Sequence, residues 1–169
     1  MSDDAIPAAT LIVVRERAGG PPELLMVERA GGMAFAAGAL VFPGGRVDEA
    51  DRRLGDSLGV DPHAIAAIRE TIEETAIPVG LRPIPDPEHS ALLQRQLVAD
   101  RPLADALSEV CCAVDSGSLT PFARWVPKFT PSAGSTRSFS LPGRPTEIGS
   151  RRSSRASARA PSGLPPMTS

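Results

Sequence analysis

The chain has 169 residues, of which 41% are hydrophobic and 22% charged, values ordinary for one globular domain with a core. No apolar run reaches the ~18 residues that a membrane-spanning helix needs, so no membrane partner is expected. The two cysteines, Cys111 and Cys112, are adjacent, which excludes a disulfide framework. The N-terminal MSDDAIPAAT has no basic group, unlike a signal peptide, and a cytoplasmic location is predicted.

Charge is distributed unevenly along the chain. Residues 1–128 contain 12 Lys and Arg against 19 Asp and Glu, a net −7, whereas residues 129–169 contain 6 Arg and 1 Glu, a net +5. An acidic domain is not typical of nucleic-acid-binding proteins, so no nucleic-acid partner is expected. It does suit a site that concentrates divalent cations.

Short aliphatic runs predict strands near the N-terminus. Residues 9–15 (ATLIVVR) and 24–28 (LLMVE), separated by the glycine–proline sequence RAGGPP, predict a β-hairpin. The run ALVF at 39–42 predicts another strand, and Pro43-Gly44-Gly45 predicts the turn that follows it.

Helices are predicted in the middle of the chain. Asp61-Pro62 has the composition of a helix start, and this helix should run to about Thr75, because Pro78 and Gly80 stop it. Residues 88–98 and 102–114 also have helical periodicity, and residues 119–126 (LTPFARWV) predict a return to strand.

After Lys128 the composition changes abruptly. Residues 129–169 are rich in Ser, Arg, Pro, Gly and Ala, and neither strand nor helix periodicity persists there. We therefore predict a folded domain over residues 1–128 and a disordered basic tail over residues 129–169.

The segment that indicates chemistry is Arg69-Glu70-Thr71-Ile72-Glu73-Glu74. On a helix its three glutamates fall within an arc of about 100°. The opposite side carries Ile65, Ile68, Ile72 and Ala76. Three carboxylates that close repel one another, and a hard cation such as Mg²⁺ would relieve the repulsion and also bridge phosphate oxygens. The alternative is a solvated acidic helix face whose charge is offset by Arg69 or a neighbouring residue.

This segment resembles the signature of the Nudix hydrolases. Gly45 matches the opening glycine, Asp51 stands at the first glutamate position, and Arg69 with the three glutamates matches R-E-x-x-E-E. Ile77 matches the closing aliphatic residue. The form F-P-G-G-x-x-D-x-x-D is similar to the branch that contains coenzyme A diphosphatases, and TPFARWV at 120–126 is similar to that branch too.

Several positions depart from the signature. Seventeen residues separate Asp51 from Arg69 where the signature has seven, so the chain has an insertion, and we predict that Arg52–Val60 is a loop tolerant of shortening. Thr71 replaces an aliphatic residue and Ala76 a glycine. For Asp51 itself, capping the insertion or pairing with Arg52 or Arg53 is an alternative to a role in the site.

The resemblance implies an α/β fold, an α/β/α sandwich around a mixed sheet that needs further strands and a helix beyond residue 128. It implies hydrolysis of the diphosphate linkage in a small-molecule nucleoside diphosphate derivative, such as coenzyme A or a dinucleotide, with Mg²⁺ or Mn²⁺. Glu73, Glu74 and the Gly45 carbonyl would be metal ligands. Glu70 would be a further ligand or the general base, and Arg69 would orient a glutamate. The alternative is an inactive Nudix-fold fragment or a nucleotide-binding module.

The remaining histidines, cysteines and tryptophan are not assigned to the site. His63 and His89 are predicted at the surface, Cys111 and Cys112 in the core, and Trp125 as a buried strand aromatic.

The tail also allows a hypothesis about the gene, which is that residues from about Thr130 onward are translated out of frame. With permissible third bases, GSTRSFSLPGRPTEIGS from Gly134 re-reads as FDTLFLAARAPDGDW, which contains a strand-like apolar run. The equal alternative is a natural basic tail. If the frame is shifted, we expect unpaired apolar edges, aggregation and weak hydrolysis.

Overall fold

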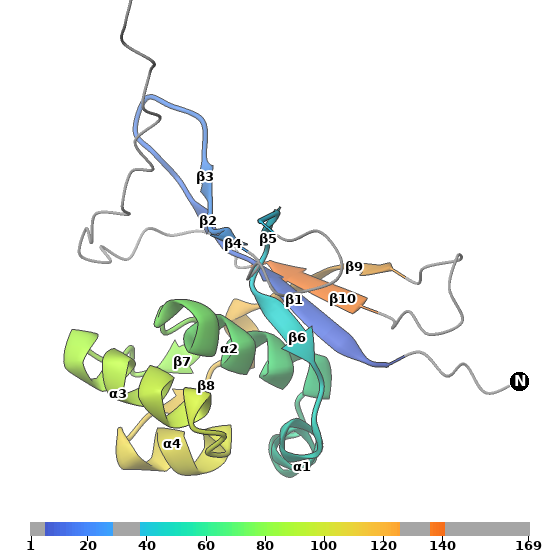
Figure 1. Ribbon diagram of the computed structural model, residues 1–169, viewed down its shortest axis with the longest axis vertical. Coiled ribbons are helices and arrows are strands. Elements are labelled where there is room, and N and C mark those ends of the chain that lie inside the picture. The colour runs from blue at the N-terminus through green and yellow to red at the C-terminus, as the bar shows by residue number, and fades with distance from the viewer. Residues whose placement is uncertain (1–5, 29–37, 126–135, 141–169) are drawn as a thin grey trace, which may run out of the picture.

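The computed structural model describes residues 6–28, 38–125 and 136–140 and places helices against a mixed sheet (Figure 1). The strand order is β6-β1-β10-β9. Strand β1 runs parallel to β10 and antiparallel to β6, and β10 is antiparallel to β9. The bounds are β1 (Ala8–Ile12), β6 (Gly44–Arg46), β9 (Thr120–Trp125) and β10 (Thr136–Ser140). The predicted α/β class with a mixed sheet is confirmed.

Helix α2 (Pro62–Thr75) packs on β1 and β6, and it contributes more buried hydrophobic residues to the core than any other described element. Ala9 and Leu11 of β1 are fully buried, as are Ile65, Ile68 and Ile72 of α2. The other helices, α1 (Glu49–Leu58), α3 (Pro87–Val98) and α4 (Leu103–Glu109), lie on the same side of the sheet (Figure 1). None of the described helices is long and apolar enough to cross a membrane. The further strands and the helix expected beyond residue 128 concern a segment of which the structure describes only residues 136–140.

Short strand pairs surround this sheet. The predicted hairpin is confirmed by β2 (Val14–Arg15) paired with β3 (Glu23–Leu24). The predicted strand at 39–42 is confirmed as β5 (Leu40–Val41), which pairs with β4 (Val27–Glu28). A third pair, β7 (Leu81–Arg82) with β8 (Ala113–Val114), and a 3-10 turn at Ser116–Ser118 connect the helices to β9.

The start and end of α2 follow from its sequence. Asp61 caps the helix by accepting a hydrogen bond from the His63 amide at 2.9 Å, and Pro62 occupies the first helical position. The helix ends at Thr75, as predicted. Ala76 then adopts the left-handed conformation, with φ 58°, and its amide bonds the Ile72 carbonyl at 2.8 Å.

We therefore expect Ala76→Gly to stabilise the protein by about 0.5–1 kcal/mol. The left-handed conformation costs a residue with a Cβ about 1–2 kcal/mol, and the greater freedom of glycine in the unfolded chain offsets part of the gain. Urea denaturation measures the change. As a control, Ala91→Gly inside α3 should instead destabilise by about 1 kcal/mol. A loss of stability in both variants would contradict the expectation.

The prediction of a loop at Arg52–Val60 is wrong, because most of this segment belongs to α1. Asp48 and Asp51 form a reciprocal capping box that starts the helix, and Gly59 ends it with φ 67°. A Cβ on Gly55 would lie 2.6 Å from the Val60 carbonyl oxygen, so this glycine permits the close return of the chain toward α2. Gly55 therefore lies within the helix and Gly59 terminates it. Shortening the segment should destabilise the fold.

The predicted turn at Pro43-Gly44-Gly45 is also wrong, because Gly44 and Gly45 belong to strand β6. A Cβ on Gly44 would lie 2.3 Å from the Ala9 carbonyl oxygen. Glycine here allows β6 to approach β1 closely, and does not serve to reverse the chain.

The prediction of one helix over 102–114 is too long, since α4 ends at Glu109 and residues 113–114 form β8. Cys111 is consequently exposed in a left-handed turn with φ 53°, which corrects its predicted core position. Cys112 is half-buried and packs against the core. The side chain of Trp125 lies outside the described residues.

Within the tail predicted to be disordered, Thr136–Ser140 forms β10 between β1 and β9. The remainder of residues 129–169 lies outside the described residues, so the boundary at Lys128, the disordered tail and the shifted reading frame stay predictions.

Candidate active site

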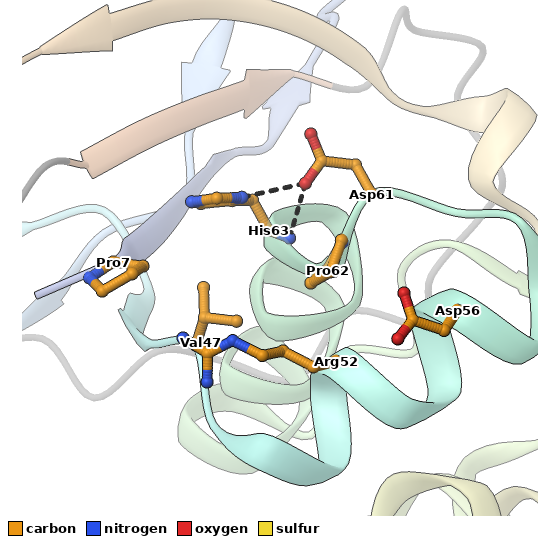
Figure 2. A pocket seen from close by; sticks show the side chains of 7 residues that line it. All are labelled: Pro7, Val47, Arg52, Asp56, Asp61, Pro62 and His63. Carbon is orange, nitrogen blue, oxygen red and sulfur yellow. Dashed lines mark hydrogen bonds and ion pairs between the residues drawn. The ribbon is translucent and has the colours of Figure 1, made fainter.

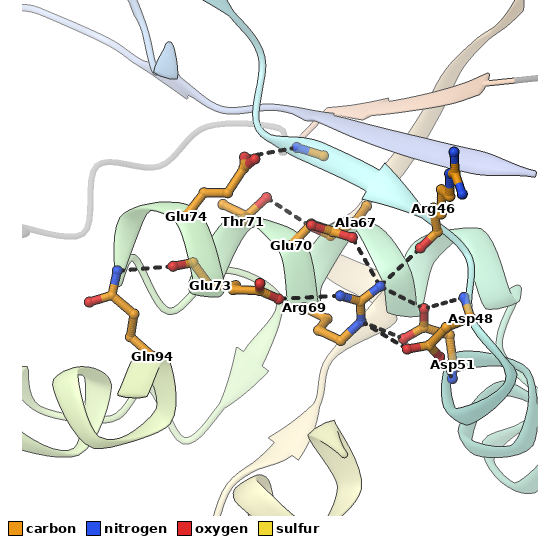
Figure 3. Close-up of polar contacts among 11 residues, drawn as sticks. Arg46, Asp48, Asp51, Ala67, Arg69, Glu70, Thr71, Glu73, Glu74 and Gln94 are labelled. Carbon is orange, nitrogen blue, oxygen red and sulfur yellow. Dashed lines mark hydrogen bonds and ion pairs between the residues drawn. The ribbon is translucent and has the colours of Figure 1, made fainter. Parts of the chain in front are cut away.

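The polar face of α2 lies against strand β6, and two of its glutamates meet the glycines there (Figure 3). Glu74 Oε2 accepts a hydrogen bond from the Gly44 amide at 3.1 Å. The Glu70 carboxylate lies directly beside Gly45, where a Cβ would be 2.2 Å from its Oε1 atom. One turn of helix therefore presents two carboxylates to the same short strand, and a side chain at position 45 would displace the Glu70 carboxylate from its present place.

Arg69 is the centre of the polar network on this face. Its guanidinium contacts Glu70 Oε1 at 3.1 Å through Nη2 and Glu73 Oε2 at 3.3 Å through Nη1. Nη2 also donates to the Arg46 carbonyl at 2.9 Å, which ties α2 to β6. Its side chain is only 13% exposed, so these contacts are weakly screened by solvent. Arg69 therefore offsets the negative charge of the acidic helix face, as the alternative interpretation of this face predicts.

Asp51 is the main partner of Arg69. Nε of Arg69 lies 3.0 Å from Asp51 Oδ1, and Nη2 lies 3.0 Å from Oδ2, a bidentate pair. The alternative role of Asp51 as a cap of the inserted segment is confirmed, because it is the third residue of α1 in the capping box. Its expected pairing with Arg52 or Arg53 is wrong, since both of these arginines pair with Glu49.

Glu73 points away from β6 and lies along Arg69 (Figure 3). Its side chain is 33% exposed. Its backbone carbonyl accepts a hydrogen bond from Gln94 Nε2 on α3 at 3.0 Å, which fixes this turn of α2 against the next helix. The structure therefore brings Gly45, Glu70 and Glu74 together, with Glu73 on the neighbouring side of Arg69.

Burial raises the pKa of the Glu70 carboxyl, against the opposing effect of Arg69, and the nearby charges of Glu73 and Glu74 act in the same direction as burial. Burial likewise raises the pKa of Asp51, despite its hydrogen bonds from Arg69. A carboxylate with a raised pKa accepts a proton more readily near neutral pH, which suits a general base.

The donor set matches a hard divalent cation. Glu70 and Glu74 supply carboxylate oxygens beside the backbone of Gly44 and Gly45, and such oxygens are the ligands that Mg²⁺ and Mn²⁺ prefer. In the described part of the chain, no three His, Cys, Asp or Glu side chains lie close enough to form a complete metal cluster.

Other positions have structural explanations. Thr71, which replaces an aliphatic residue of the signature, is fully buried, and its hydroxyl donates to the Ala67 carbonyl at 2.7 Å. His89 is largely exposed. His63 has 23% of its side chain exposed and contacts Asp61 at 2.8 Å, so it is less open than predicted.

His63 lines a separate open pocket of about 300 Å³ at the other end of α2 (Figure 2). The pocket is lined by Pro7, Val47, Arg52, Asp56, Asp61, Pro62 and His63. None of the glutamates on α2 contributes to it, so it is not the site built around Arg69.

Two contacts of the site were not expected from the sequence. The Gln94 bond to α2 and the Arg69 bond to the Arg46 carbonyl both join segments more than twenty residues apart. Asp48, by contrast, had a local signal, since an acid three residues before Asp51 is the pattern of a capping box.

Comparisons with known proteins agree with this geometry. The chain is similar to the crystal structure of a Nudix hydrolase from Alicyclobacillus acidocaldarius, with a TM-score of 0.66 and 30% sequence identity. The match covers 83% of this chain and 70% of that one. No protein-family model and no curated protein matches the chain. The fold, the identity and the extent of the match show that the chain belongs to the Nudix hydrolase family.

Proposed function

We propose that the protein hydrolyses the diphosphate linkage of a nucleoside diphosphate joined to another moiety, with Mg²⁺ or Mn²⁺ as its cation. The observation that carries the proposal is the convergence of Glu70 and Glu74 on the glycine strand β6, next to the buried Arg69. Membership of the Nudix family supports the reaction class, since these hydrolases generally act on such substrates with divalent metal ions.

Each residue of the site then has a role. The cation would be held by Glu73, Glu74 and the Gly45 carbonyl, with Glu70 as a further ligand or as the general base. When bound, it would neutralise the diphosphate, polarise the P–O bond and lower the pKa of the attacking water. Arg69 orients Glu70 and Glu73 through its charge-assisted hydrogen bonds. The raised pKa of Glu70 supports its assignment as proton acceptor.

For the substrate we propose coenzyme A or a dinucleotide. The support is in the sequence, where F-P-G-G-x-x-D-x-x-D covers Phe42–Asp51 and resembles the coenzyme A diphosphatase branch. Both acids of this pattern have a structural role, because Asp48 and Asp51 form the capping box of α1.

The test is a hydrolysis assay across coenzyme A, NADH, ADP-ribose and dinucleotide polyphosphates, with Mg²⁺, Mn²⁺ or EDTA. We expect turnover of at least one substrate with a divalent cation and none with EDTA. Because cleavage within the diphosphate of coenzyme A, NADH or ADP-ribose leaves two phosphomonoesters, chromatography of the products identifies the bond that breaks. Full turnover in EDTA would contradict the metal assignment, and no turnover of any substrate would contradict the proposed reaction.

One observation favours a second candidate, a nucleotide-binding module without turnover. Arg69 already compensates Glu70 and Glu73, and the described residues contain no complete metal cluster. Calorimetry with ADP-ribose separates the two functions, because a binding module would give a heat of binding without product release.

A further inference from the structure

Asp48 lies beside the site, and its Oδ2 atom is 3.8 Å from Nε of Arg69. It is the N-cap residue of α1, and its Oδ1 atom accepts a hydrogen bond from the Asp51 amide at 2.7 Å. Its own amide donates to Asp51 Oδ2 at 3.0 Å. The carboxylate of Asp51 is therefore held from one side by the backbone of Asp48, at the point where α1 begins.

The same Asp51 carboxylate is held from the other side by Arg69. Both oxygens of Asp51, which is 1% exposed, are taken up by the guanidinium at 3.0 Å. The remaining donors of Arg69 reach Glu70 and Glu73. A continuous series of hydrogen bonds and ion pairs thus runs from the start of α1 through Asp51 and the largely buried Arg69 to the carboxylates proposed for chemistry (Figure 3).

We propose that Asp48 is a positioning residue of the hydrolase site, acting through Asp51 and Arg69 on Glu70 and Glu73. A planar guanidinium with several fixed partners has one orientation in which all its contacts are satisfied. If the cap opens, Asp51 loses the backbone donor that sets its rotamer, and Arg69 can follow it. The effect on catalysis rests on the proposed function, whereas the effect on the Arg69 orientation does not.

The geometry separates Asp48 from an ordinary helix cap. Its side chain is 51% exposed, and its replacement leaves Arg69 paired with the carboxylates of Asp51, Glu70 and Glu73. Asp86 caps α3 in a comparable way, accepting from the His89 amide at 2.9 Å, but no contact links it to Arg69. Asp86→Ala is therefore a matched control for the loss of a cap alone.

The experiment compares Asp48→Ala, Asp48→Asn and Asp86→Ala in the full chain. Asp48→Ala should lower kcat about 10–100-fold with little change in KM, in line with the loss of partners that orient metal ligands. Asp48→Asn keeps an oxygen that accepts the Asp51 amide, so kcat should return to within about threefold of wild type. Asp86→Ala should lower Tm like Asp48→Ala and keep wild-type kcat.

A second measurement needs neither substrate nor metal. In ¹H–¹⁵N spectra, the Nε–H of Arg69, assigned by its loss in Arg69→Lys, should shift and exchange faster with water in Asp48→Ala only. An unchanged Arg69 signal in Asp48→Ala, or equal kcat in Asp48→Ala and Asp86→Ala, would overturn the proposal. If the wild-type chain does not hydrolyse any substrate, the spectra still decide whether Asp48 positions Arg69, and only the proposed function fails.

Discussion

In the hydrolysis assay, Glu73→Gln and Glu74→Gln are each expected to lower kcat by about 10²–10³-fold while leaving the fold intact. A metal ion that stabilises the transition state by several kcal/mol contributes that factor, since each 1.36 kcal/mol is tenfold in rate. Glutamine keeps the size of the side chain, and its amide oxygen can still accept the Gly44 amide in place of Glu74 Oε2. The loss would therefore report the missing charge and not a missing hydrogen bond.

The two variants should not be equal. Glu74 accepts a hydrogen bond from the glycine strand, whereas the Glu73 side chain lies beside Arg69 (Figure 3). We expect the larger loss for Glu74→Gln. Glu88→Gln is the matched control, because Glu88 is an exposed acid in the first turn of α3, away from the site. Circular dichroism and Tm check the fold, and near-wild-type activity in both site variants would contradict the assignment.

Helix α2 shows what could be predicted from the sequence and why. Its cap at Asp61, the proline at its first position and the spacing of its buried isoleucines are all local signals. The shared face of Glu70 and Glu74 follows from the same periodicity, because residues four apart lie on one side of a helix. The part of the site that lies on one helix can therefore be predicted from the sequence.

The rest of the site depends on contacts between segments, which a single sequence does not show. The pairing of Arg69 with Asp51 crosses seventeen intervening residues, which span the rest of α1, the turn at Gly59 and the first half of α2. In the sequence, the glycines of β6 predict a turn. In the structure they are needed because β1 and the Glu70 side chain approach the β6 backbone closely. Glycine marks a close backbone contact as readily as a chain reversal.

Strand β10 was the element least visible in the sequence. Its place between β1 and β9 is set by backbone pairing, and Thr136–Ser140 has little of the aliphatic character that marks a strand. The shifted reading frame would place its apolar run over these same residues. Sequencing the gene around codons 128–134 tests that hypothesis, and an intact downstream frame without the strand motif would contradict it.

Gly45→Ala should have the second large effect, a loss of about 10²-fold in kcat, because it displaces Glu70. The new Cβ would lie 2.2 Å from Oε1 and 2.4 Å from Cδ of Glu70, so the carboxylate must move. A displacement of about 1 Å at a reacting group can cost that factor. The overpacking should also destabilise the fold by about 1–3 kcal/mol.

The controls for Gly45→Ala separate the displacement of Glu70 from a general effect of adding a methyl group. Gly20→Ala meets no atom within 4 Å and should change neither kcat nor Tm. In the double variant with Glu70→Asp, the shorter side chain withdraws from the methyl group. A thermodynamic cycle should then show that the two stability losses are less than additive. Activity should stay low in the double variant, since the shorter carboxylate no longer reaches its original place. Wild-type kcat in Gly45→Ala would show instead that Glu70 is not needed beside the glycine strand, and would remove it from the proposed site.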